Sequence, residues 1–147
     1  MKLFRAAVLA AALAAVPFAA AVAPAWANGD LAAKAEKLPK LVLGQGDNDF
    51  AMSVKEYKLK TGKAYNWTIV SSGMKEYGLV APDFFRNIWL RHVAINDLEV
   101  KASGLNEVEF DGEGAMEVVF VPIRPGKYEF KIKQFADRGM VGTIVVE

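Results

Sequence analysis

The stretch FVPIRPGKYEFKIKQFADRGMVGTIVV, residues 120–146, decides the fold that this chain is expected to adopt. Within it, Tyr128, Phe130 and Ile132 alternate with charged residues and follow a Pro-Gly pair. A loop ending in Gly-Met-Val-Gly leads to a final run rich in valine. Alternation of this kind predicts a half-buried strand, and a Pro-Gly pair marks a turn. The stretch therefore predicts two strands joined by a structured loop, with the side chain of Ile132 in the core.

The rest of the chain after residue 40 has the same character. Short runs of β-branched and aromatic residues are separated by Gly, Asn, Asp and Pro. Strands are predicted at Leu41–Leu43, Phe50–Ser53, Glu56–Lys60, Ala64–Ser71, Tyr77–Val80, Val93–Lys101, Glu107–Phe110, Met116–Val121, Lys127–Lys133 and Val141–Val146. Many short strands at this spacing are typical of an antiparallel sandwich with its core between two sheets. We therefore predict one all-β domain over residues 41–147.

One segment departs from the strand pattern. It begins at Asp83, which could cap a helix, and it places Phe85, Ile88 and Trp89 on one helical face. We therefore expect one short helix at about residues 83–91, packed over a sheet.

The N-terminus has the features of a secretory signal peptide. Lys2 and Arg5 form a charged start, an alanine-rich run follows, and Ala-Trp-Ala precedes residue 28. We expect residues 1–27 to be cleaved, which would leave a periplasmic protein without a membrane span. The alternative is an uncleaved anchor, since the apolar run is long enough to cross a bilayer. Residues 28–40 are expected to form a linker or a short helix.

Composition argues against several classes of function. The formal net charge is +1 and the charges are interspersed, so no nucleic-acid or anionic-membrane footprint is visible. The chain has no cysteine, hence no disulfide and no thiolate ligand for a metal. With a single histidine and no cysteine, the chain has few of the side chains that hydrolytic enzymes use as nucleophile or general base.

The closing stretch resembles the C-terminal hairpin of the cupredoxin family, in which a Tyr-containing strand after a Pro-Gly turn leads into a metal loop. Gly126, Tyr128 and Phe130 fall at family positions, and residues 139–142 match the Gly-Met-x-Gly that ends the loop. The resemblance covers roughly residues 50–147 and implies a Greek-key β-sandwich. A short helix in the middle of the chain also fits this family.

The resemblance places this chain's residues at the family's ligand positions. Ile132 stands at the cysteine position, Asp137 most nearly at one histidine position, and Glu76 at the other. Met140 keeps the methionine position, and Met74 lies just upstream of Glu76. A blue-copper centre needs a thiolate and two imidazoles. The chain is therefore not expected to be a blue-copper electron carrier.

We expect Glu76, Asp137 and Met140 to converge at one end of the sandwich, with Met74 nearby. Carboxylates favour harder ions, including iron and Cu(II), whereas thioethers favour Cu(I), so such a site would hold iron or copper loosely. The alternative is that the carboxylates are solvated or paired with a base, and that Met140 is an apolar plug.

Two further candidates carry weaker signals. The only histidine, His92, would matter as a ligand only if the fold brought it beside Glu76 or Met140; a lone histidine is more often a packing or surface residue. An acidic cluster surrounds a glycine-rich turn and consists of Glu107, Glu109, Asp111, Glu113 and Glu117. An exposed hairpin edge kept soluble by charge is favoured over a cation site there.

Two functions from different classes fit this sequence. The first is a periplasmic protein that handles iron or copper. Residues 49–62 and 81–89 are similar to the cupredoxin-like component of bacterial periplasmic ferrous-iron uptake systems. That similarity implies a periplasmic metal-binding protein or an inner-membrane metal permease as partner. The second is a metal-free interaction module that contacts a partner through Phe84–Trp89. An oxidase acting alone is least favoured, because no multi-copper ligand set is visible; an accessory role in ferrous-iron oxidation stays open.

Overall fold

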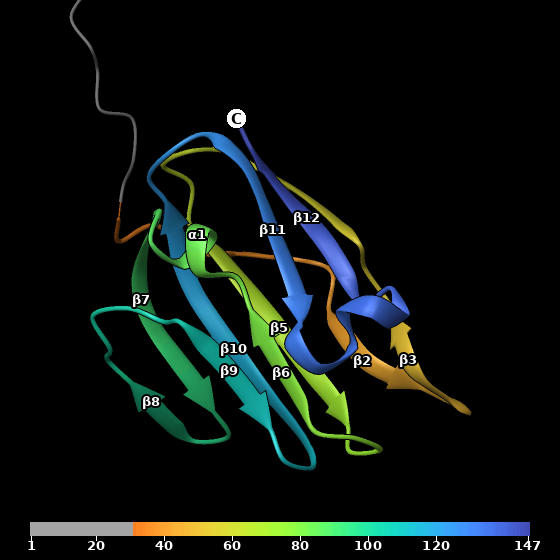
Figure 1. The fold of residues 1–147 in the computed structure, drawn as a ribbon. Coiled ribbons are helices and arrows are strands. Elements are labelled where there is room, and N and C mark those ends of the chain that lie inside the picture. The colour runs from red at the N-terminus through yellow and green to blue at the C-terminus, as the bar shows by residue number, and fades with distance from the viewer. Residues whose placement is uncertain (1–30) are drawn as a thin grey trace, which may run out of the picture.

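The computed structural model describes residues 31–147 as two β-sheets packed face to face (Figure 1). The expected signal peptide and its cleavage site lie outside these residues. Among the described residues, no helix is long and apolar enough to cross a membrane.

The first sheet contains the three longest strands. Its members are β1 (Glu36–Lys37), β2 (Leu41–Gln45), β3 (Asn48–Met52), β5 (Tyr65–Ser72), β7 (Ile88–Ile95), β8 (Leu98–Val100) and β10 (Glu113–Pro122). They lie in the order β3-β2-β5-β10-β7-β8, and β1 also pairs with β5. The pairings of β1 and β2 with β5 are parallel, and the other pairings in this sheet are antiparallel.

The second sheet has five strands. Its members are β4 (Glu56–Leu59), β6 (Tyr77–Val80), β9 (Glu107–Phe110), β11 (Gly126–Ile132) and β12 (Val141–Val146). Their order is β4-β12-β11-β6-β9, so the free edges of this sheet are β4 and β9. The all-β sandwich predicted from the sequence is confirmed, and the predicted bounds of β6, β9 and β12 agree with the structure.

The expected helix at residues 83–91 is wrong in its second half. Helix α1 spans only Pro82–Phe85, and β7 begins at Ile88. Asp83 does not cap α1, because the N-cap residue is Ala81 and makes no side-chain cap hydrogen bond. Residues from Ile88 onward instead pair with β10, and these ladder hydrogen bonds outweigh the local helical pattern.

Two other expectations are corrected by strand pairing. The predicted single strand Val93–Lys101 is divided between β7 and β8 by a two-residue turn, in which Asn96 has a φ of 51°. Asparagine tolerates this left-handed conformation better than most residues. Within residues 28–40, which were expected to form a linker or short helix, the pair Glu36–Lys37 forms β1 instead.

The core is built around an aromatic cluster between the two sheets. Trp67 is 1% exposed, and its ring centroid lies 5.5 Å from that of Tyr57 and 5.7 Å from that of Phe130, both in edge-on contacts. Phe84, from α1, meets Trp67 from the side at 6.5 Å. Burial raises the pKa of Tyr57 to about 12, and its hydroxyl donates a hydrogen bond to the Pro39 carbonyl oxygen. Helix α1 thus contributes Phe84 to this aromatic cluster.

Core atoms lie so close to the backbone of β12 that one position in this strand requires glycine. A β-carbon on Gly142 would lie 2.2 Å from Cζ of Phe130 and 2.9 Å from the backbone oxygen of Lys55. We expect Gly142→Ala to lower the free energy of unfolding by about 1–3 kcal/mol, because the core must shift to admit the methyl group. Urea unfolding measures the change. Gly112→Ala is the matched control, since a β-carbon there meets nothing within 4 Å. Equal midpoints for the two variants would contradict the packing described here.

Candidate functional site

Three segments that are distant in the sequence meet at one end of the sandwich. They are the loop between β5 and β6, the turn between β9 and β10, and the 3-10 segment η1 (Lys133–Arg138) between β11 and β12 (Figure 1). Together they surround an open pocket of about 550 Å³, which we call the loop-end pocket. Its lining residues are Gly73, Met74, Lys75, Glu76, Asp111, Gln134 and Phe135.

Glycines shape both of the longer loops. Gly73 has a φ of 76°, and a β-carbon there would lie 2.6 Å from the backbone nitrogen of Glu113. Gly139 has a φ of 83° and ends η1. Its N–H donates to the carbonyl of Ala136, as expected for a left-handed cap. These two turns bring the β5–β6 loop and η1 to the same end of the fold.

The structure brings together two of the residues predicted as ligands. Met74 and Glu76 both line the loop-end pocket, and the side chain of Met74 is 55% exposed. Asp137 is exposed on η1 but does not line this pocket. Met140 does not line it either, because its side chain is fully buried in the core. A carboxylate that the site prediction did not include, Asp111, lines the pocket from the β9–β10 turn.

Core side chains stand at two positions that the resemblance to cupredoxins assigns to metal ligands. Ile132 is fully buried, as the alternation in β11 predicted, and Met140 is buried beside it. The backbone N–H of Ile132 donates to the carbonyl of Met140 at 3.0 Å, and the N–H of Met140 donates to the carbonyl of Phe135. These bonds turn the segment after η1 back into the sandwich. The burial of Met140 matches its expected alternative role as an apolar plug.

The bases near this end have partners of their own. Lys75 Nζ lies 3.6 Å from the carboxylate of Asp49, and the guanidinium of Arg138 lies over the ring of Phe50. These are the two bases that the sequence offers as neighbours of Glu76 and Asp137. Among residues 31–147, no group of three or more His, Cys, Asp or Glu is placed so that it could hold a metal ion.

His92 lies on β7 in the first sheet, opposite Val119 of β10. Its Nε2 atom is 3.7 Å from Oε1 of Glu99, which lies on β8. It does not line the loop-end pocket. The structure therefore gives this histidine a carboxylate neighbour in its own sheet, and not a place beside Met74 and Glu76.

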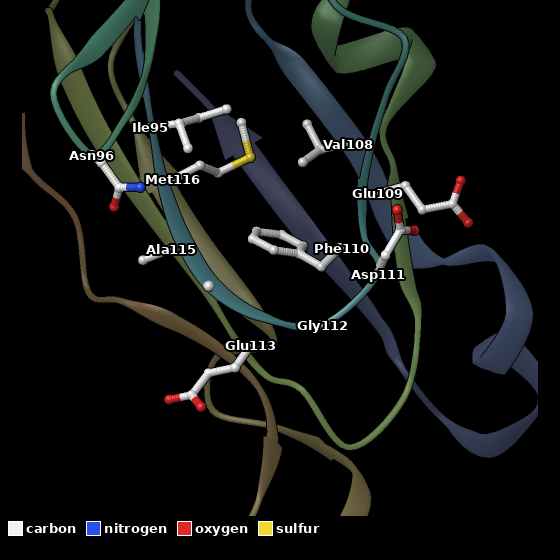
Figure 2. A pocket seen from close by; sticks show the side chains of 11 residues that line it. Ile95, Asn96, Val108, Glu109, Phe110, Asp111, Gly112, Glu113, Ala115 and Met116 are labelled. Atoms are coloured by element: carbon white, nitrogen blue, oxygen red, sulfur yellow. The ribbon is translucent and has the colours of Figure 1, made fainter.

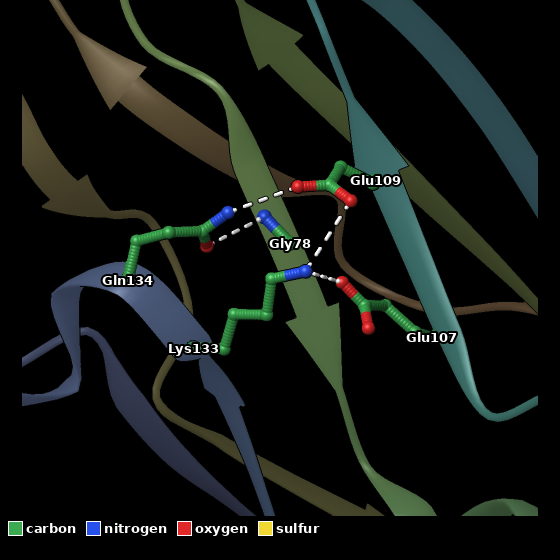
Figure 3. Close-up of polar contacts among 5 residues, drawn as sticks. All are labelled: Gly78, Glu107, Glu109, Lys133 and Gln134. Carbon is green, nitrogen blue, oxygen red and sulfur yellow. Dashed lines mark hydrogen bonds and ion pairs between the residues drawn. The ribbon is translucent and has the colours of Figure 1, made fainter.

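A polar network that the sequence did not reveal holds η1 in place (Figure 3). Lys133 Nζ donates to Glu107 and, at 3.3 Å, to Glu109, and the hydrogen bond to Glu107 raises the pKa of Lys133. Gln134 donates to Glu109 and accepts a hydrogen bond from the backbone N–H of Gly78. The network crosses β6 at Gly78, where a β-carbon would lie 2.8 Å from the side chains of Glu107 and Lys133. It therefore fixes one wall of the loop-end pocket to the second sheet.

The segment Phe84–Trp89, expected to contact a partner in the interaction-module hypothesis, is mostly part of the core. Phe84 and Phe85 are buried, whereas Trp89 is 41% exposed on β7. The surface that this segment offers is therefore limited to Arg86, Trp89 and part of Asn87.

The chain matches no protein-family model and no curated protein. Among solved structures, it is similar to one described as "Multicopper oxidase from Campylobacter jejuni: a metallo-oxidase", with a TM-score of 0.54 and 11% sequence identity. The similarity covers 78% of this chain and 30% of that chain, so this chain corresponds to less than a third of the oxidase. At this identity the likeness concerns the fold alone. The described chain is thus an all-β sandwich with a cupredoxin-like fold.

Proposed function

We propose that this chain is a periplasmic metal-handling protein that binds iron or copper weakly at the loop-end pocket. The observation that supports the proposal most is the meeting of Met74, Glu76 and Asp111 around one open pocket, at the loop end of a cupredoxin-like sandwich. The residues do not fit a blue-copper centre, because the chain has no cysteine and Ile132 and Met140 are core residues.

The donor set favours loose binding. Glu76 and Asp111 offer carboxylate oxygens, which suit harder ions, and Met74 offers a thioether, which suits Cu(I). The amide oxygen of Gln134 is already engaged with the N–H of Gly78. The protein thus supplies few ligands, and water would complete the coordination. An exposed site with few protein ligands suits a protein that transfers its ion to another carrier.

The transfer partner in this proposal is an inner-membrane metal permease or a second periplasmic metal-binding protein. The support is the similarity of residues 49–62 and 81–89 to the cupredoxin-like component of bacterial ferrous-iron uptake systems. An accessory role in ferrous-iron oxidation is compatible with the same pocket, because an ion held by exposed carboxylates stays accessible to an acceptor.

Metal titration of the secreted protein tests the proposed site. We expect Glu76→Gln and Asp111→Asn each to weaken Fe(II) binding under anaerobic conditions by about tenfold, because each removes one of two charged ligands. The matched control is Asp83→Asn, which removes an exposed carboxylate at the opposite end of β6. Calorimetry or competition with a chelator gives the affinities. Equal affinities in all four proteins, or no binding, would overturn the proposal.

The same titration separates the two kinds of ligand. Met74→Leu should weaken Cu(I) binding and leave Fe(II) binding unchanged, whereas Met140→Leu should change neither, because that side chain is buried. Cu(II)-loaded protein should show no intense blue absorption, since that colour arises from a thiolate ligand. Loss of Cu(I) affinity in Met140→Leu would instead place the site at the family's methionine position.

A further inference from the structure

An apolar strip on the first sheet is left uncovered by the second. Ile95, Leu98 and Val100 are 42%, 62% and 41% exposed. Val100 pairs directly with Val93, which is buried in the core, and Leu98 pairs with Ile95, two residues beyond Val93. Directly paired residues and residues two apart lie on the same face of a sheet. These three side chains therefore lie on the inward face of the sheet.

The strip is exposed because the two sheets end at different places. The first sheet ends at β8, and the second ends at β9. A pocket lined from β7, β9 and β10 shows that these two edges lie on the same side of the sandwich. Among the described strands, none follows β9 in the second sheet. The inward face of β8 thus faces the place where one more strand of the second sheet would lie.

The adjoining pocket, of about 420 Å³, continues this apolar surface into the sandwich. Figure 2 shows the side chains of Ile95, Val108, Phe110 and Met116 directed into the space between the strands. Val108 and Met116 belong to the core, and Phe110 packs against it. A side chain entering from outside would therefore meet a preformed apolar surface.

The border of this surface is acidic. Glu107 and Glu109 contact Lys133, which partly balances them. Asp111, the residue directly after β9, forms no ion pair within residues 31–147. The edge therefore favours a positively charged occupant. It disfavours β9 of a second copy, because antiparallel pairing of two such edges would bring like charges together.

We propose that the β9 edge accepts an extended segment of a partner protein that is apolar on one face and carries lysine or arginine on the other. The segment adds to the second sheet beside β9 through backbone hydrogen bonds. Its apolar side chains cover Ile95, Leu98 and Val100, and its basic side chains face the acidic residues of β9 and Asp111. An open strand edge beside exposed apolar residues is the arrangement that such strand addition requires. The proposal shares Asp111 with the loop-end pocket but does not require a bound metal.

A short synthetic peptide that alternates lysine and valine is the probe for this site. In NMR titrations of isotope-labelled protein, we expect saturable shift changes confined to β8, β9 and the β9–β10 turn. A peptide alternating glutamate and valine should bind about tenfold more weakly or not at all, because its charges repel the edge. A lysine–valine peptide with methylated backbone nitrogens should also lose about tenfold, which separates strand addition from charge attraction alone. Shift changes spread over the whole surface would overturn the proposal.

Surface variants test the two parts of the edge separately. Leu98→Ser and Asp111→Lys should each weaken binding of the lysine–valine peptide by about tenfold and leave the unfolding midpoint unchanged, since both residues are exposed. The controls are Ile123→Ser and Glu129→Lys, which make the same kinds of change at exposed positions away from this edge. Equal losses in the controls would refute the site. A dimer in sedimentation that Leu98→Ser dissociates would also refute it, by assigning this face to a second copy.

Discussion

Replacing Trp67 with alanine is expected to lower the free energy of unfolding by about 3–5 kcal/mol, as for other fully buried large aromatic residues. Its indole ring is 1% exposed and contacts Tyr57, Phe84 and Phe130, which come from β4, α1 and β11. The cavity would therefore open where both sheets and the helix meet. Because these elements pack tightly against one another, the neighbouring side chains can move only slightly into the cavity. Urea unfolding followed by circular dichroism measures the loss.

The control for this variant is a second tryptophan in the same protein. Trp89 lies on β7 and is 41% exposed, so its replacement by alanine removes the same atoms from a partly solvated position. We expect its effect to be below about 1 kcal/mol, in the range of surface substitutions. Similar losses for both variants would show that the aromatic cluster is not the centre of the core.

The second large effect is expected at Ile132, which the resemblance to cupredoxins places at their cysteine position. Ile132→Ala should lower the free energy of unfolding by about 2–5 kcal/mol, because the side chain is fully buried between the sheets. The matched control is Ile123→Ala, on an isoleucine that is 57% exposed, where we expect about 0.5 kcal/mol or less. A loss at Ile132 no larger than that at Ile123 would be inconsistent with its place in the core.

The burial of Ile132 and Met140 bears on how this end of the sandwich is held together. The resemblance to cupredoxins assigns these two positions to metal ligands. Here both are apolar, and the loop is held by backbone hydrogen bonds and by the contacts of Lys133 and Gln134 with β9. We therefore expect the domain to fold without a metal ion.

The sequence alone predicted the features that depend on local alternation. In β11, Tyr128, Phe130 and Ile132 alternate with charged residues, and a strand with one buried face must place them inward. Short β-branched and aromatic runs between turn residues located β6 and β12 at their observed bounds. The turn residues between these runs separated the strands, and the sandwich follows from many such half-buried strands.

Local patterns failed where a tertiary partner decided the conformation. Residues 88–91 have helical spacing, but β10 provides hydrogen-bond partners for them, and they form a strand. The Gly-Met-Val-Gly pattern does not reveal whether its thioether points to a ligand site or to the core. The backbone hydrogen bonds that return the chain from η1 to Ile132 direct Met140 inward.

The candidate site and the open edge were likewise decided by tertiary structure. Glu76 and Asp111 lie on different loops, and only the order of the strands brings them to one pocket. The exposure of Leu98 and Val100 follows from the second sheet ending at β9 while the first continues to β8. Alternation along a strand determines which side chains share a face, since the pleat has a period of two. Whether another strand covers that face depends on contacts between residues far apart in the chain, which no local pattern encodes.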